Sequence, residues 1–222
     1  MEKPVTLDAP LTSLPGIGPQ RAALFARLNV RTVGELLRLY PRAYEDRTRL
    51  VSIASLEAGT PACFEAAVVT TPRTNRIPKP GSRMLEVTKF TVADDTGRLN
   101  LTFFNAAHSA GALRIGERYC FYGVLTGDFA AYGMTTPLFE PCDGPAHVTR
   151  RILPVYPLTA GLTNSMVLRA QAQAVSRCAG LLPETLPPEL LRRYGLCGAA
   201  EACREIHCPT SAAALGRAQR RL

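Results

Sequence analysis

The sequence contains no tryptophan, and only three of its 26 basic residues are lysines, so 23 are arginines. Arginine binds phosphate through two parallel hydrogen bonds and stacks on nucleobases better than lysine does. A coding bias toward arginine would give the same count. The net charge of +8 has the sign that suits a polyanionic partner. Most of this charge lies at the ends, because residues 1–49 carry +3, residues 50–149 carry −1 and residues 150–222 carry +6.

Long apolar segments are also missing. No stretch approaches the roughly 18 consecutive apolar residues of a membrane-spanning helix, and the first residues show no secretory signal. We therefore expect a soluble chain in the cytoplasm, where its seven cysteines stay reduced. No two of them have the C-x-x-C spacing typical of structural zinc sites. The densest group is Cys197, Cys203, His207 and Cys208, where we expect partly buried thiols and no metal.

A glycine turn precedes the first helical segment, with the sequence Leu14-Pro15-Gly16-Ile17-Gly18-Pro19. Glycines let backbone N–H groups approach a phosphate, and the N-terminus of the following helix adds partial positive charge. Gly16 and Gly18 are therefore candidate phosphate ligands. The alternative is a tight turn with Pro19 at the first helical position, which needs glycine only for its backbone dihedrals.

The chain divides into three ranges by pattern. Residues 1–49 predict a helical hairpin unit, residues 50–149 contain short alternating segments typical of an OB-type β-barrel, and residues 150–222 predict a linker followed by helices. The predicted fold class is α+β: an OB-type barrel (the wedge) flanked by a small N-terminal helix-hairpin-helix-like unit and a C-terminal helical segment. Three arginines near the first boundary could form ion pairs in the crossover or contact DNA: Arg42, Arg47 and Arg49.

The segment after the Asp94–Gly97 hairpin signal carries the clearest functional pattern. Alternation places Leu99, Leu101 and Phe103 on the buried face of a strand, and Arg98, Asn100, Thr102 and Phe104 on the other face. An outward Phe104 beside polar residues is a candidate platform for stacking a base. The alternative is that a loop or another domain covers it.

Other parts of the barrel add basic and aromatic candidates. Residues 70–82 contain three prolines with Arg73, Arg76 and Lys79, which predicts a basic loop between strands. A last strand over residues 131–139 bears Tyr132, and residues 106–113 are compatible with a helix.

The C-terminal range begins with an extended linker over residues 153–162. Helices are expected over 163–179, from Pro187, and over 199–207. The final run, residues 212–222, favours a helix but stops at Arg220-Arg221-Leu222 without a cap. We expect this run to be unfinished and to fray, because a short isolated helix is marginal in water.

Four motifs in order resemble the N-terminal wedge region of RecG-type DNA helicases. They are the glycine turn, Tyr40-Pro41-Arg42-Ala43-Tyr44-Glu45-Asp46-Arg47-Thr48, the Asp-Thr-Gly hairpin before Phe103-Phe104-Asn105, and Pro154-Val155-Tyr156-Pro157-Leu158-Thr159-Ala160-Gly161-Leu162. The resemblance covers nearly the whole chain. It implies a wedge that splits stalled replication forks and Holliday junctions in DNA repair and recombination, while two C-terminal motor lobes hydrolyse ATP.

The resemblance and the residue patterns together give the candidate site. Phe104 matches the stacking aromatic of the family, and His108 stands where the family can have a second planar side chain. The base-stacking candidates are Phe104, His108 and Tyr132. The phosphate candidates are Gly16, Gly18, Arg73, Arg76, Lys79, Arg83 and Arg98.

The sequence departs from the family in lacking any G-x-x-x-x-G-K-[ST] loop or acidic motor motif. We therefore expect no catalytic residue and no cofactor in this chain; ATP and magnesium are expected only on the missing motor domains. The expected partners are branched DNA, single-stranded DNA and helicase motor domains in cis or trans, with the chain itself a monomer in the nucleoid. It looks like the front of a longer protein. The alternatives are a freestanding single-strand-binding factor and a protein-interaction module in which Phe104 is covered.

Overall fold

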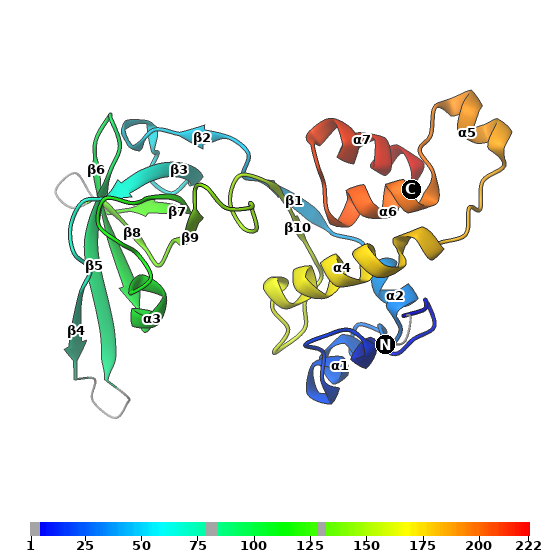
Figure 1. The fold of residues 1–222 in the computed structure, drawn as a ribbon, viewed down its shortest axis with the longest axis horizontal. Coiled ribbons are helices and arrows are strands. Elements are labelled where there is room, and N and C mark those ends of the chain that lie inside the picture. Colours follow the sequence, from blue (N-terminus) through cyan, green and yellow to red (C-terminus); the bar gives the residue numbers. More distant parts are fainter. Residues whose placement is uncertain (1–4, 79–83, 128–131) are drawn as a thin grey trace. The chain divides into compact units, whose positions relative to one another are not determined.

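The structure is a computed structural model that describes residues 5–78, 84–127 and 132–222. It contains two compact units (Figure 1). The first unit combines the chain up to Glu45 with the chain from Ile152 onward, and the second unit is Asp46–Arg151. The predicted middle range, 50–149, nearly coincides with the second unit, whereas the ranges 1–49 and 150–222 come together in the first. They do so because their helices share one hydrophobic core.

The first unit is helical. Its N-terminal part contains η1 (Leu11–Ser13), α1 (Pro19–Ala26) and α2 (Val33–Leu37), and its C-terminal part contains α4 (Asn164–Cys178), η3 (Ala179–Leu181), α5 (Pro188–Tyr194), α6 (Ala199–His207) and α7 (Ala212–Arg221). Pro19 occupies the start of α1, as the alternative interpretation of the glycine turn expects. Thr32 caps α2 in a capping box, because its side chain accepts from the Glu35 N–H while the Glu35 carboxylate accepts from the Thr32 N–H.

The shared core of this unit draws on residues far apart in the sequence. Phe25, Leu36 and Leu37 from the N-terminal helices lie in one buried cluster with Tyr156 and Ala174 from the C-terminal part. The extended linker predicted over 153–162 in fact begins as a strand, β10 (Ile152–Val155), which pairs with β1 (Ala43–Asp46) in a two-stranded sheet. These contacts explain why neither part forms a unit of its own.

The C-terminal helix α7 is docked, contrary to the unsupported tail expected from the sequence. Ala214, Leu215 and Ala218 are buried, and Leu215 belongs to a hydrophobic cluster with residues of α6 and β10. The Arg221 guanidinium lies 2.5 Å from the Glu184 carboxylate and also donates to the Cys197 carbonyl. The helix therefore has an apolar face and a charged end that are both bound within the unit.

The second unit is a closed OB-type barrel, as predicted. Its elements are β2 (Leu50–Val51), η2 (Ile53–Ser55), β3 (Pro61–Val68), β4 (Arg73–Ile77), β5 (Leu85–Ala93), β6 (Arg98–Phe104), α3 (Ala107–Ala110), β7 (Arg118–Thr126), β8 (Gly133–Thr135) and β9 (Leu138–Pro141). The order β3-β5-β6-β8-β7 closes because β7 also pairs with β3. Inward-facing side chains such as Phe64, Leu101 and Phe121 fill the interior.

Two details of the barrel differ from the sequence prediction. The predicted loop over residues 70–82 contains β4, which pairs with β5 and extends it into a ribbon. The predicted last strand over 131–139 is divided into β8 and β9, because Thr136 between them adopts a left-handed conformation with φ 45°. Within the described residues, no helix is long and apolar enough to span a membrane.

Candidate nucleic-acid interface

Polar side chains from β4, β5, β6 and β8 lie next to one another on the outer face of the barrel. Register places Arg73 of β4 opposite Lys89 of β5, Lys89 opposite Thr102 of β6, and Thr102 beside Thr135 of β8. Directly paired residues share a face, so these four side chains form a row across the strands. Gly133 permits the close approach of β8, because a Cβ there would lie 2.9 Å from the Asn100 carbonyl oxygen.

This row lies in a groove with a volume of about 720 Å³. The groove is lined by Thr70, Thr71, Arg73, Lys89, Phe90, Thr91, Asn100, Leu101, Thr102, Thr126, Gly127, Tyr132, Gly133, Met134 and Thr135. The groove therefore contains two cations, several hydroxyls and one half-exposed phenol ring. Such groups bind phosphates, sugars and bases in the grooves of single-strand-binding proteins. The groove could therefore hold a nucleic-acid strand.

Phe104 lies two residues beyond Thr102 on the same face of β6. Its side chain is 42% exposed, whereas the adjacent Phe103 is 2% exposed and stacks on Phe90 at a centroid distance of 5.6 Å. The predicted alternation along this strand is confirmed, with Leu99 and Leu101 also buried. Within the described residues, Phe104 keeps a large part of its ring open to solvent.

The other sequence-predicted residues of the barrel fall into different places. Arg73 and Tyr132 line the groove. Arg98 is exposed at the start of β6, and His108 is exposed on α3, four residues after Phe104. Arg76 lies on the opposite face of the β4–β5 ribbon. Its Nε atom is 3.1 Å from a Glu86 carboxylate oxygen, so it is paired within the barrel. Lys79 and Arg83 lie outside the described residues.

Lys89 is the main groove residue that the sequence reasoning missed. The alternation that places Lys89 is visible in the sequence of β5. Outward-facing residues there alternate with buried ones: Lys89 and Thr91 alternate with Thr88, Phe90 and Val92. The same period of two that identified Phe104 would have placed Lys89 on the outer face. Its pairing with Arg73 depends on the strand register and could not be read from the sequence.

The crossover arginines have different environments. Arg42 and Arg49 are exposed, but Arg47 is 7% exposed, with its guanidinium 3.7 Å from the centroid of the Tyr122 ring. It also donates to the Val148 carbonyl at 2.7 Å. Arg47 therefore packs within the second unit, where it is not available as a surface contact to DNA.

The glycine turn has one glycine that its backbone requires. Gly16 has φ 78°, and its carbonyl accepts a 2.5 Å hydrogen bond from the Arg21 guanidinium. Gly18 is the N-cap of α1 with ordinary extended dihedrals, and a Cβ there would meet nothing within 4 Å. Arg21 and Arg169 line a cleft of about 310 Å³ beside this turn. The turn thus presents basic groups at the start of a helix.

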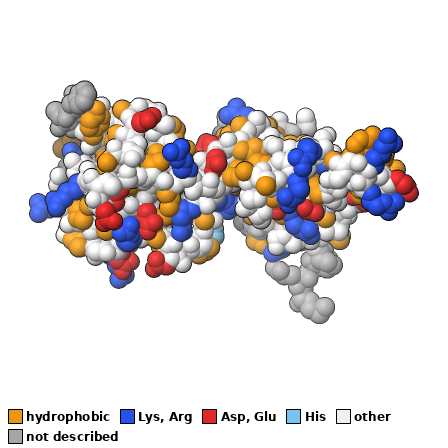
Figure 2. All heavy atoms as spheres, turned by 90° about the horizontal axis from the view of Figure 1, so that it is seen from above, with side chains coloured by type: hydrophobic (Ala, Val, Ile, Leu, Met, Phe, Trp, Pro, Cys, Tyr) orange, Lys and Arg blue, Asp and Glu red, His pale blue; other side chains and the backbone are white. Residues whose placement is uncertain are grey.

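On the face drawn in Figure 2, Lys and Arg side chains are scattered among Asp and Glu side chains. On this face, charge alone does not mark an interface, and the groove is distinguished by the side chains that the strands bring together.

The cysteine-rich segment at α6 cannot form a metal site with its histidine. His207 is buried, with Nδ1 2.8 Å from the Tyr156 hydroxyl and Nε2 2.9 Å from the Leu37 carbonyl oxygen. Burial lowers the pKa of His207 to about 4, although the hydrogen bond to Leu37 opposes this shift. Both ring nitrogens are engaged, so this neutral imidazole supports the core of the first unit.

Comparison with known proteins identifies the family. The profile of the RecG wedge domain matches residues 11–177. The chain belongs to the RecG wedge-domain family. The four motifs that suggested this resemblance all lie within the matched residues.

Full-length relatives of the wedge chain are considerably longer. The chain is 33% identical over 215 residues to the ATP-dependent DNA helicase RecG of Escherichia coli K12, covering 91% of the chain and 29% of that protein. It is 29% identical over 233 residues to the RecG of Synechocystis, covering 98% of the chain and 28% of that protein. The chain thus spans less than a third of the length of these curated relatives.

A solved structure supports the fold. The chain superposes on RecG bound to a three-way DNA junction with a TM-score of 0.86 and 24% sequence identity, covering all of this chain and 30% of that one. This match shows that the wedge chain has the fold of the corresponding part of RecG.

Proposed function

We propose that this chain is the branched-DNA-binding wedge of a RecG-type helicase that remodels stalled forks and Holliday junctions in DNA repair and recombination. The family match and a structural relative that is bound to a three-way DNA junction support this function. The observation that carries the proposal is the polar groove on the barrel with the half-exposed Phe104 ring on the same face.

Each group has a proposed role in this function. Arg73 and Lys89 contact phosphates of one separated strand, and Tyr132 stacks on a base in the groove. Phe104 caps the last base pair or the first separated base at the branch point. His108 is proposed as a second, weaker planar contact near Phe104.

The remaining basic candidates have supporting roles. Arg98 contributes a phosphate contact at the edge of β6. Gly16 and Gly18 offer backbone N–H groups to a phosphate beside Arg21. Lys79 and Arg83 stay predicted phosphate contacts.

Strand separation at a fork needs work, and this sequence contains no phosphate-binding loop that could couple ATP hydrolysis to it. We therefore propose that ATP and magnesium are bound by motor domains that act with this wedge in cis or trans. The wedge itself is proposed to be a monomeric binding element without ATPase activity, acting on DNA in the cytoplasm.

Fluorescence anisotropy with labelled DNA tests the proposal. The chain should bind a three-way junction more tightly than a blunt duplex of equal length at the same salt concentration, because the wedge needs separated strands. Affinity should fall steeply as salt rises, since phosphate contacts release counterions. Equal affinity for junction and duplex would refute the proposal. Equal affinity for junction and single strand would favour a freestanding single-strand-binding factor.

Matched variants on one ribbon locate the interface. Lys89→Ala and Arg73→Ala should each reduce the slope of log affinity against log salt by about 1, as expected for the loss of one phosphate contact. Arg76→Ala is the control. Arg76 carries the same charge as Arg73 and lies on the same strand, β4, but it pairs with Glu86 on the other face of the ribbon. A control variant that loses as much affinity as the two groove variants would contradict the assignment.

A further inference from the structure

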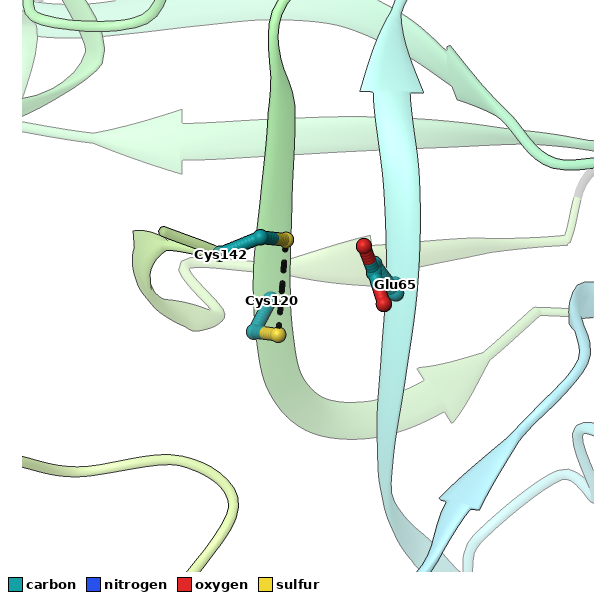
Figure 3. A group of neighbouring side chains, drawn as sticks. All are labelled: Glu65, Cys120 and Cys142. Carbon is teal, nitrogen blue, oxygen red and sulfur yellow. Dashed lines mark hydrogen bonds between the residues drawn. The ribbon is translucent and has the colours of Figure 1, made fainter. Parts of the chain in front are cut away.

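A second cluster of reactive side chains lies on the barrel, on strands other than those that carry the groove's central row. Glu65 of β3 lies directly opposite Cys120 of β7, and Cys120 lies opposite Glu140 of β9. Cys142 follows β9 by one residue. Figure 3 shows the Cys120 and Cys142 thiols facing each other, with the Glu65 carboxylate beside them. Three residues spaced widely in the sequence thus meet at one point.

The distances in this cluster match a metal tetrahedron. The Cys120 and Cys142 sulfur atoms are 3.6 Å apart, and both lie within 4.8 Å of a Glu65 carboxylate oxygen. Two thiolates that bind zinc with bonds of about 2.3 Å at the tetrahedral angle are separated by about 3.8 Å, whereas a disulfide requires about 2.05 Å. The sulfur atoms are therefore already spaced as two ligands of one ion.

We propose that Glu65, Cys120 and Cys142 bind a thiophilic divalent cation such as Zn²⁺, with solvent as the fourth ligand. Cys120 is buried, whereas Glu65 and Cys142 are half-buried, so an ion can reach the ligands from one side. Three protein ligands with one solvent position are a common arrangement for zinc.

Charges around the cluster are compatible with such an ion. Two thiolates, one carboxylate and the cation have a net charge of −1. The Glu140 carboxylate opposite Cys120 adds a further negative charge, and the Arg118 guanidinium, 3.2 Å from the Glu65 carboxylate, together with the Arg150 guanidinium offsets these charges. Zinc binds cysteine as the thiolate, so binding releases two thiol protons to solvent and should strengthen as pH rises.

The segment after β9 is already held in place. The Arg150 guanidinium donates to the carbonyls of Cys142 and Gly144, at 2.5 and 3.0 Å. Glu140 accepts from the backbone N–H groups of His147, Val148 and Thr149. These bonds fix the backbone that carries Cys142, as outer partners do for metal ligands. A bound cation would tie this segment to β3 and β7.

Cobalt titration of the reduced full chain tests the site. Co²⁺ gives thiolate charge-transfer bands and the visible absorption of a tetrahedral ion, so it reports ligands directly. We expect one tightly bound Co²⁺ per chain, displaced by Zn²⁺, with higher affinity at pH 8 than at pH 6. Cys142→Ser and Glu65→Gln should each weaken cobalt binding by about 100-fold or more. Removing an outer partner of a metal ligand already costs up to about 100-fold, and removing a ligand itself should cost at least as much.

Cys197→Ser is the matched control, because Cys197 is also half-buried but belongs to the first unit. It should bind cobalt as the unmodified chain does. Circular dichroism verifies that each variant is folded, and Glu65→Gln provides the test if a cysteine variant does not fold. The proposal is overturned if the unmodified chain shows no thiolate–cobalt band, or if Cys142→Ser and Glu65→Gln bind cobalt as tightly as the control.

Discussion

Adjacent phenylalanines on β6 should respond in opposite ways to the same substitution. Phe103 is 2% exposed and packs against Phe90 and Phe139, at centroid distances of 5.6 and 5.9 Å. Removing such a buried ring costs about 3–5 kcal/mol, because both transfer energy and packing are lost. With a urea m-value of about 2 kcal/mol/M, Phe103→Ala should lower the unfolding midpoint by about 2 M. Phe104→Ala, at a half-exposed surface position, should change the unfolding free energy by roughly 0.5 kcal/mol or less.

DNA binding should show the reverse order. Loss of one stacked base costs about 1–3 kcal/mol, so Phe104→Ala should weaken junction binding about 5- to 150-fold. Phe104→Trp should retain binding because it keeps a planar ring. Anisotropy at a temperature where every variant is folded separates this effect from stability. The reasoning is refuted if Phe104→Ala binds the junction normally, or if it loses as much stability as Phe103→Ala.

Three further outcomes are expected from urea unfolding and amide exchange. Arg47→Ala should lower the unfolding free energy of the barrel by about 2–4 kcal/mol, because a desolvated contact with Tyr122 and a charged hydrogen bond are both lost; an unchanged midpoint would contradict this. His207, with its pKa near 4, is neutral in the folded chain, whereas the unfolded chain binds a proton below about pH 6.5. The unfolding free energy should therefore fall by up to about 1.4 kcal/mol per pH unit from pH 6.5 to 5, and His207→Gln should remove this slope. Amides of α7 should be protected and should exchange faster in Leu215→Ala; rapid exchange in the unmodified chain would show that the helix is not docked.

Local periodicity was sufficient for the two faces of β6 and for the bounds of α6, although it missed β4 and β10. The pleat alone assigns the inward and outward residues of β6, because successive side chains point to opposite faces of the sheet. A strand shifted by one residue would have every side chain on the wrong face. The bounds of α6 were likewise predicted at residues 199–207. The ordered motifs also gave the family, since they lie in segments whose sequence is distinctive by itself.

Interactions between distant segments decided the rest. The groove depends on register, which sets Arg73 opposite Lys89 and could not be read from either strand. Cys120 and Cys142 looked isolated in the sequence, and only the pairing of β7 with β9 brings their thiols together.

The C-terminal helix shows the physical reason for this division. The sequence predicted a helix here, and fraying was expected because a short isolated helix is marginal in water. What stabilises it is a surface built by β10 and α6, together with the Glu184 carboxylate that pairs with Arg221. Backbone geometry repeats every few residues, so the local sequence determines it. Burial and charge pairing depend on partners that come together only in the folded chain.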